Sequence, residues 1–102
     1  GKETVEFIKS EISKCETVFW NGPVGVFESR PFHLGTFEIA KYIAEITINN
    51  NLRSFAGGGD TISALDMAAV KEKFTYVSTG GGALLELIEG KKLPGLVALG
   101  AL

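Results

Sequence analysis

The 102-residue sequence predicts an α/β fold, built on a parallel sheet of three or four strands with flanking helices. Short apolar runs rich in β-forming residues alternate along the chain with longer segments of helical periodicity, and glycine-containing turns follow the runs. This length allows one domain at most. Because ligands of parallel sheets gather at the carboxyl ends of the strands, the loops that leave those ends are the first candidates for a site.

The first half of the chain predicts two helices and a strand. Apolar residues at helical spacing indicate a helix over about residues 3–15, and a continuous apolar run indicates a strand at 17–20. A long connection is expected to run to Gly35. A second helix is expected from Thr36 to the three asparagines that precede Leu52.

The next segments continue the alternation. A strand is expected at 54–56, and Asp60 is expected to cap a third helix. The buried face of that helix is expected to carry Ile62, Leu65 and Ala69. The stretch 67–74 fits either a continued helix or a loop.

The last quarter of the chain predicts three further segments. A strand is expected at 74–77 and a fourth helix at 83–88, which Gly90 would end. The residues 97–99 fit either a last strand or a tail.

Composition and charge exclude several classes of protein. A net charge of −2 with scattered lysines offers no footprint for nucleic acid, and no apolar run approaches the roughly 20 residues that span a membrane. Cys15 has no partner for an internal disulfide, so a cytoplasmic location is expected, with Cys15 as a small core residue. Since the chain starts at Gly1, we expect either a processed end or a cut through something longer.

Two triple-glycine runs are the main candidates for chemistry: Gly57-Gly58-Gly59-Asp60-Thr61 and Ser78-Thr79-Gly80-Gly81-Gly82-Ala83. Each lies between an apolar segment and a helix-like one, an arrangement that aims backbone N–H groups at a phosphate. Neither run fits the dinucleotide fingerprint or the P-loop. Asp60 would repel a bare phosphate, so the first run indicates a nucleotide bound through Mg²⁺. The alternatives are that Asp60 is only a helix cap and that the second run is only a tight turn.

A third segment, Asn21-Gly22-Pro23-Val24-Gly25-Val26-Phe27-Glu28, is expected at the same edge of the sheet. Its apolar residues suit a flat base, and Glu28 is suited to accept hydrogen bonds from ribose hydroxyls. A plain surface turn is the alternative.

These three segments, with Glu89-Gly90-Lys91-Lys92-Leu93-Pro94-Gly95, resemble the C-terminal part of phosphoglycerate kinases over essentially all of residues 1–102. The resemblance implies the C-terminal portion of a nucleotide-binding, Rossmann-like α/β domain, that is, a partial domain of a two-domain kinase. It implies the glycolytic transfer of a phosphoryl group between 1,3-bisphosphoglycerate and ADP, which gives 3-phosphoglycerate and ATP with Mg²⁺. The intact enzyme is then expected to be a cytoplasmic monomer without a nucleic-acid or membrane partner.

The resemblance also implies roles for single residues. The nucleotide-binding roles fall on Asn21, Pro23, Val26, Glu28, Gly58, Gly59, Asp60, Thr61, Gly80 and Gly81. Among these, Glu28 would contact the ribose and Asp60 would hold the metal. The amides of Gly59 and Gly82 would face the phosphoryl group during its transfer.

Neither glycine run contains a lysine or arginine to neutralise the transition state. In the family that charge comes from earlier lysines and from the N-terminal domain, so the 102 residues alone are expected to be inactive and to depend on the remainder of a kinase chain. A non-catalytic module that binds a nucleotide or another anion is the main alternative, and an inactive folding fragment is a third.

Overall fold

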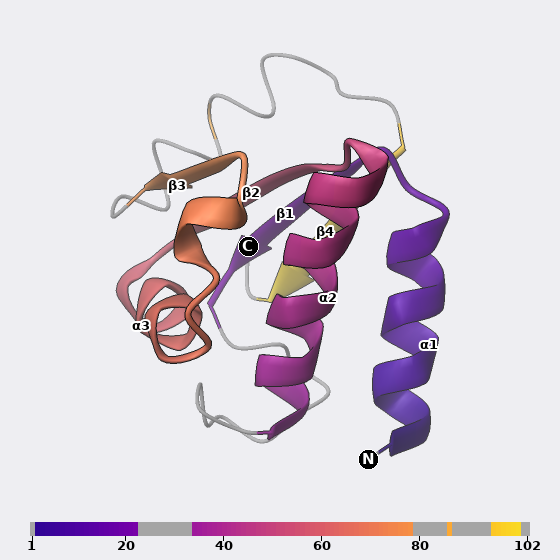
Figure 1. The fold of residues 1–102 in the computed structure, drawn as a ribbon, viewed down its shortest axis with the longest axis horizontal. Helices are drawn as coiled ribbons and strands as arrows, with labels where there is room; N and C mark the ends of the chain where they lie inside the picture. Colours follow the sequence, from indigo (N-terminus) through magenta and orange to yellow (C-terminus); the bar gives the residue numbers. More distant parts are fainter. Residues whose placement is uncertain (1, 23–33, 79–85, 87–94, 101–102) are drawn as a thin grey trace.

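The computed structural model describes residues 2–22, 34–78, 86 and 95–100 and shows an α/β architecture (Figure 1). The elements in chain order are α1 (Lys2–Ser13), β1 (Thr17–Asn21), α2 (Leu34–Asn50), β2 (Arg53–Gly57), α3 (Gly59–Met67), the 3-10 turn η1 (Lys71–Lys73), β3 (Tyr76–Ser78) and β4 (Leu96–Gly100). The α/β fold class expected from the sequence is thereby confirmed.

The described strands form one sheet of four parallel strands in the order β3-β2-β1-β4. Asn21 at the end of β1 is level with Gly57 on one side and with Gly100 on the other, and Gly57 is level with Ser78. The carboxyl ends of β1, β2 and β3 therefore share one edge, as predicted. The segment 97–99 lies within β4, which pairs with β1 and is not a tail.

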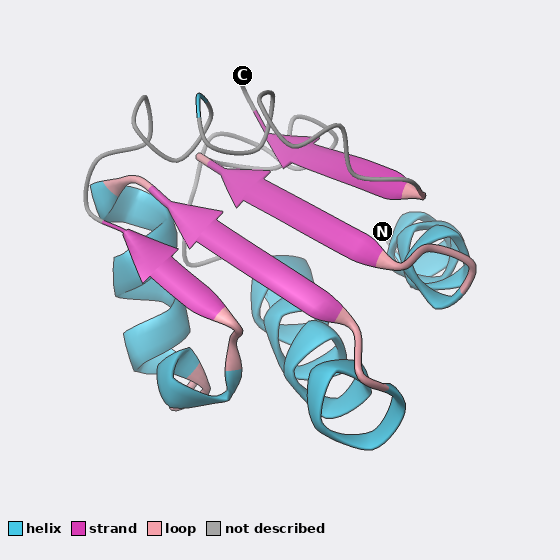
Figure 2. Ribbon diagram, turned by 90° about the horizontal axis from the view of Figure 1, so that it is seen from above, coloured by secondary structure: helices cyan, strands magenta, loops and turns pink. Residues whose placement is uncertain are grey.

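The three helices α1, α2 and α3 lie on the same face of the sheet (Figure 2). Strand side chains alternate between faces, so Val18 and Trp20 enter the core under the helices while Phe19 points the other way. The side chains that form this core are Val5, Ile8, Ile12, Val18, Trp20, Ile39, Ala40, Ile43, Ala44, Leu52, Ala56, Leu65, Val70, Phe74 and Leu99.

A small network of hydroxyl groups satisfies the polar residue Ser54, which is fully buried in β2. The Thr47 and Ser54 hydroxyl oxygens lie 2.8 Å apart, and the Thr75 N–H donates to Ser54 Oγ at 3.1 Å. In return, the Ser54 N–H donates to Thr75 Oγ1 at 2.9 Å. Since a buried hydroxyl without partners destabilises a fold, these bonds explain how serine is accommodated inside the sheet.

The structure corrects the predicted ends of α2 and β3. The helix α2 begins at Leu34, so Gly35 lies inside it and does not end the preceding connection. The third strand is Tyr76–Ser78, two residues later than expected at its start, because the Phe74 N–H bonds Lys71 O and closes the turn η1. The predicted helix at 83–88 lies outside the described residues except for Glu86.

The predicted N-cap of α3 was wrong, as was the buried position expected for Ala69, whereas the sequence allowed either a continued helix or a loop after Met67. Gly58, not Asp60, is the N-cap, and Asp60 is the second residue of the helix. At the other end α3 stops at Met67, and Ala69 is exposed with a φ of 59°. The Ala69 N–H bonds Asp66 O and the Val70 N–H bonds Leu65 O, the pair that defines a Schellman motif. Alanine occupies the position that glycine usually takes, which concealed the helix end in the sequence.

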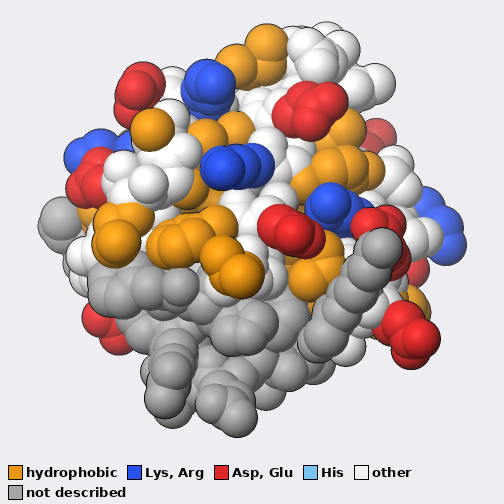
Figure 3. Space-filling model, turned by 60° about the horizontal axis from the view of Figure 1, so that its bottom comes forward, with side chains coloured by type: hydrophobic (Ala, Val, Ile, Leu, Met, Phe, Trp, Pro, Cys, Tyr) orange, Lys and Arg blue, Asp and Glu red, His pale blue; other side chains and the backbone are white. Residues whose placement is uncertain are grey.

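Acidic and basic side chains are interspersed on the face of the molecule turned forward in Figure 3, with apolar side chains between them. Among the described side chains on that face, no patch of a single sign gathers. Among the described helices, none is long and apolar enough to span a membrane.

Two isoleucines of α2 test the core directly. Ile43 is fully buried and Ile48 is 58% exposed. We expect Ile43→Ala to lower the free energy of unfolding by about 2–4 kcal/mol, because it leaves a cavity in the core. The matched change Ile48→Ala should alter it by less than about 0.5 kcal/mol. Urea denaturation of both variants measures the difference, and equal losses would contradict the assignment of this core.

Candidate functional site

Two turns meet at the carboxyl edge of the sheet. The first is Asn21–Gly22 at the end of β1, and the second is Gly57–Thr61, which runs from the end of β2 into α3. The Gly22 N–H donates to Thr61 Oγ1 at 2.7 Å, which joins residues 39 positions apart in the sequence. A Cβ added to Gly58 would lie 2.8 Å from Asn21 Oδ1, so the two turns are in close contact.

Gly58 connects several parts of this edge. Its N–H donates to Ser78 O at 3.3 Å, and its carbonyl accepts the Ile62 N–H at 3.0 Å. Its φ of 90° and ψ of 145° lie in a region that residues with a Cβ rarely adopt. Glycine is therefore required at this position both by the backbone conformation and by the contact with Asn21.

The first turn of α3 offers backbone donors to an anion. Helix geometry leaves the N–H groups of Gly59 and Asp60 without an acceptor inside the helix, and both residues are exposed. A Cβ added to Gly59 would meet nothing within 4 Å, so there is open space beside the helix end. Donors, space and the positive end of the helix dipole together suit a phosphate.

Asp60 brings a carboxylate to the same helix end. The two ion pairs between described residues join Lys14 to Glu11 and Lys71 to Asp66, so neither engages Asp60. Within the described part of the chain no three metal-ligating side chains gather at one place. Mg²⁺ commonly takes only one or two protein carboxylates and completes its shell with phosphate oxygens and water, so Asp60 fits as its protein ligand.

Trp20 has a role that the sequence did not reveal. Its side chain belongs to the core and the residue is 1% exposed, yet its indole Nε1–H donates to Gly22 O at 2.8 Å. The indole therefore reaches from the core to the turn that follows β1. No local pattern in the sequence indicates this bond.

The structure brings together the predicted site residues Asn21, Gly58, Gly59, Asp60 and Thr61 at one edge of the sheet. The other predicted site residues lie outside the described part of the chain: Pro23, Val26, Glu28, Gly80, Gly81 and Gly82. Their roles remain predictions. Because Ser78 is level with Gly57, the second glycine run starts from the same edge as the first.

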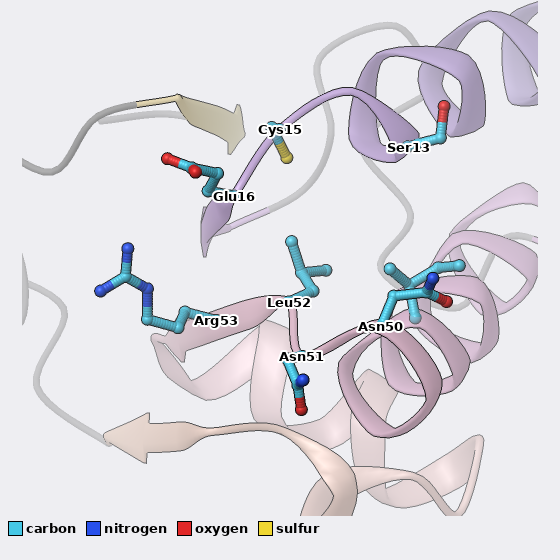
Figure 4. A pocket seen from close by; sticks show the side chains of 8 residues that line it. Ser13, Cys15, Glu16, Asn50, Asn51, Leu52 and Arg53 are labelled. Atoms are coloured by element: carbon cyan, nitrogen blue, oxygen red, sulfur yellow. The ribbon is translucent and has the colours of Figure 1, made fainter.

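A separate hollow of about 590 Å³ opens at the opposite, amino-terminal edge of the sheet (Figure 4). Its lining residues are Ser13, Cys15, Glu16, Ile46, Asn50, Asn51, Leu52 and Arg53. Burial raises the pKa of the Cys15 thiol, which donates to Ile12 O at 3.1 Å. Burial thus favours the neutral thiol over the thiolate, which is the nucleophilic form of cysteine.

Comparison with known proteins identifies relatives of this chain. A family model described as phosphoglycerate kinase matches residues 1–91. The phosphoglycerate kinase of Rhodospirillum centenum is 52% identical over 101 residues, which cover 99% of this chain and 26% of that protein. The enzyme of Agrobacterium fabrum is 54% identical over 99 residues, which cover 97% of this chain and 25% of that protein.

A solved structure shows the same similarity. The structure of phosphoglycerate kinase from Coxiella burnetii matches with a TM-score of 0.69 and 41% identity, over 88% of this chain and 22% of that one. The chain therefore spans about a quarter of the length of the curated relatives it matches.

Adjacent glycines test the contact between the two turns. We expect Gly58→Ala to lower the free energy of unfolding by about 1–3 kcal/mol, because the new methyl group meets Asn21 and the φ is unfavourable. The matched change Gly59→Ala adds a methyl group in open space at a helical position, and should be neutral or slightly stabilising. Thermal and urea unfolding measure both variants, and an equal effect at the two positions would contradict the described geometry.

Proposed function

Because this chain belongs to the phosphoglycerate kinase family, we propose that it forms one side of the Mg²⁺-nucleotide site of a cytoplasmic glycolytic kinase. In this proposal, residues 1–102 are the C-terminal portion of the nucleotide-binding domain. The enzyme transfers a phosphoryl group from 1,3-bisphosphoglycerate to ADP and forms 3-phosphoglycerate and ATP. In the reverse direction the acceptor is the carboxylate of 3-phosphoglycerate.

The observation that carries the proposal is the close contact of Asn21–Gly22 with the N-terminus of α3. This contact supports the proposal, because in it the Asn21–Gly22 turn would face the nucleoside and the adjacent exposed helix N–H groups would face the phosphates. Asp60, exposed and outside any described ion pair, would hold the Mg²⁺ that links the nucleotide to the protein. When bound, the metal neutralises negative charge on the phosphate oxygens.

Phosphoryl transfer needs positioning and electrostatic stabilisation more than it needs a covalent nucleophile. The exposed Gly59 amide can donate to an oxygen of the group in transfer, and we propose the same role for Gly82 and a phosphate-binding role for Gly80 and Gly81. Pro23, Val26 and Glu28 complete the nucleoside side of the proposal. All these groups are backbone donors, carboxylates or apolar surface, so they bind and orient the nucleotide but supply no positive side chain.

The alternative is a non-catalytic module that binds a nucleotide. A turnover assay distinguishes this module from the proposed kinase. We expect the 102-residue chain alone to form no ATP from 1,3-bisphosphoglycerate and Mg-ADP, because it carries no cation in either glycine run. A coupled ATP assay on this chain and on the full chain that the gene encodes makes the comparison. ATP formation by the 102 residues alone would contradict the expectation that the rest of the enzyme supplies part of the active site. If the full chain formed no ATP either, the result would favour the binding module.

The two aspartates of α3 test the metal role. Asp60→Asn should weaken binding of Mg-ADP by about 10- to 100-fold and leave metal-free ADP unchanged or slightly tighter, since it removes a negative charge. The matched change Asp66→Asn, in the same helix but paired with Lys71 at 3.0 Å, should leave both affinities unchanged. Titration calorimetry of the full chain with and without Mg²⁺ measures them, and equal weakening of both forms of ADP by Asp60→Asn would refute a metal role.

A further inference from the structure

We propose that Thr61 and Trp20 are positioning residues, which hold the Gly22 peptide and so fix Asn21 against the phosphate-facing turn, and that the Thr61 hydroxyl is not itself a phosphate ligand. This inference deepens the proposed nucleotide site and rests on it.

The backbone N–H and carbonyl of Gly22 both form hydrogen bonds with side chains. Its N–H donates to Thr61 Oγ1 at 2.7 Å, and its carbonyl accepts the Trp20 Nε1–H at 2.8 Å. The two partners come from different elements, β1 and α3, and both are almost fully buried, at 1% and 2% exposed. Gly22 has a φ of 86°, in the range that favours glycine, and glycine without such bonds keeps much conformational freedom.

The two bonds have a consequence for Asn21. With the next residue held at its N–H and its carbonyl, the end of β1 has little freedom to move away from α3. Asn21 Oδ1 then stays within reach of the Gly58 α-carbon, where only glycine fits. Thr61 and Trp20 thus act on a nucleotide through Asn21 and Gly22.

Burial argues against a direct contact between the Thr61 hydroxyl and a phosphate. A phosphate oxygen must approach a hydroxyl to about 2.5–3.0 Å to form a hydrogen bond. Thr61 is 2% exposed, so little of its surface is open to a ligand, and its hydroxyl oxygen accepts the Gly22 N–H. Gly59 and Asp60, immediately before it, are exposed and remain accessible to the anion.

Thr61→Val tests the role, because valine keeps the shape of threonine and removes the acceptor of the Gly22 N–H. ADP and adenosine are the two probes, since adenosine lacks phosphate. In the full chain, Thr61→Val should raise the dissociation constants of both by a similar factor of about three- to tenfold. Thr61→Ser, which keeps the hydroxyl, should restore both to within about twofold of the unmodified chain. Trp20→Phe removes the other bond and should act in the same direction on both probes.

The control is Thr17→Val at the opposite end of β1. The Thr17 hydroxyl is buried and makes no hydrogen bond with the described residues, so its loss should leave both affinities unchanged. This control separates the loss of the Gly22 bond from the general effect of a valine inside the fold.

The outcomes are distinct. Weaker binding of ADP alone by Thr61→Val would overturn the inference, because it would indicate a direct phosphate contact. Unchanged affinity for both probes, whatever the change in melting temperature, would overturn it as well. If the unmodified full chain did not bind Mg-ADP at all, the proposed function would fail first, whereas normal binding with an unaffected Thr61→Val variant would remove this inference only.

Discussion

The hydrogen bond from the Gly22 N–H to Thr61 Oγ1 joins the end of one strand to the helix that follows the next. It forms because β1 and β2 run parallel in a register that places Asn21 level with Gly57. A slip of one residue would turn the strand side chains to the opposite faces and would bring different residues to this edge. The geometry of the candidate site therefore depends on the packing that sets the register.

Trp20 connects the packing of the core to the candidate site. Its ring lies among the core side chains beneath the helices, while its indole N–H bonds the Gly22 carbonyl. A change in the core that moved the ring would also move the turn after β1. Stability and site geometry are thus coupled at this residue, in contrast to Gly59 and Asp60, which lie at the surface.

Local pattern was enough to predict most elements of the fold. Helical spacing of apolar residues located α1 and α2, and short β-forming runs located β1 and β2, because each of these signals is contained in a few consecutive residues. The features that escaped prediction depend on contacts between distant residues or on unusual backbone conformations. The segment 97–99 could not be assigned because a strand of this length is defined by its partner, here β1.

The ends of α3 and the bonds to Gly22 illustrate the same limit. A glycine N-cap has no capping side chain, so no sequence pattern marks it. The nearby Asp60 is a residue type preferred at N-caps and was therefore predicted instead. The predicted parallel topology did place the loops after β1 and β2 at one end of the sheet, since parallel strands bring their carboxyl ends together. No local pattern indicated that Thr61 would hold Gly22, because a bond across 39 residues has no periodicity to detect.

The groups described at the carboxyl edge of the sheet can bind an anion or a metal ion, but none of them is a positively charged side chain. It presents N–H groups, a helix dipole and one carboxylate, and the segments Asn21–Gly22 and Gly57–Thr61 contain no lysine or arginine. Such groups orient a metal-bound nucleotide well, but the three charged oxygens of a phosphoryl group in transfer need cations that these turns do not supply. The chain spans about a quarter of the length of its curated relatives. Under the proposed function, this end of the sheet would position the nucleotide, and the cations that stabilise the transferred group would come from other parts of the enzyme.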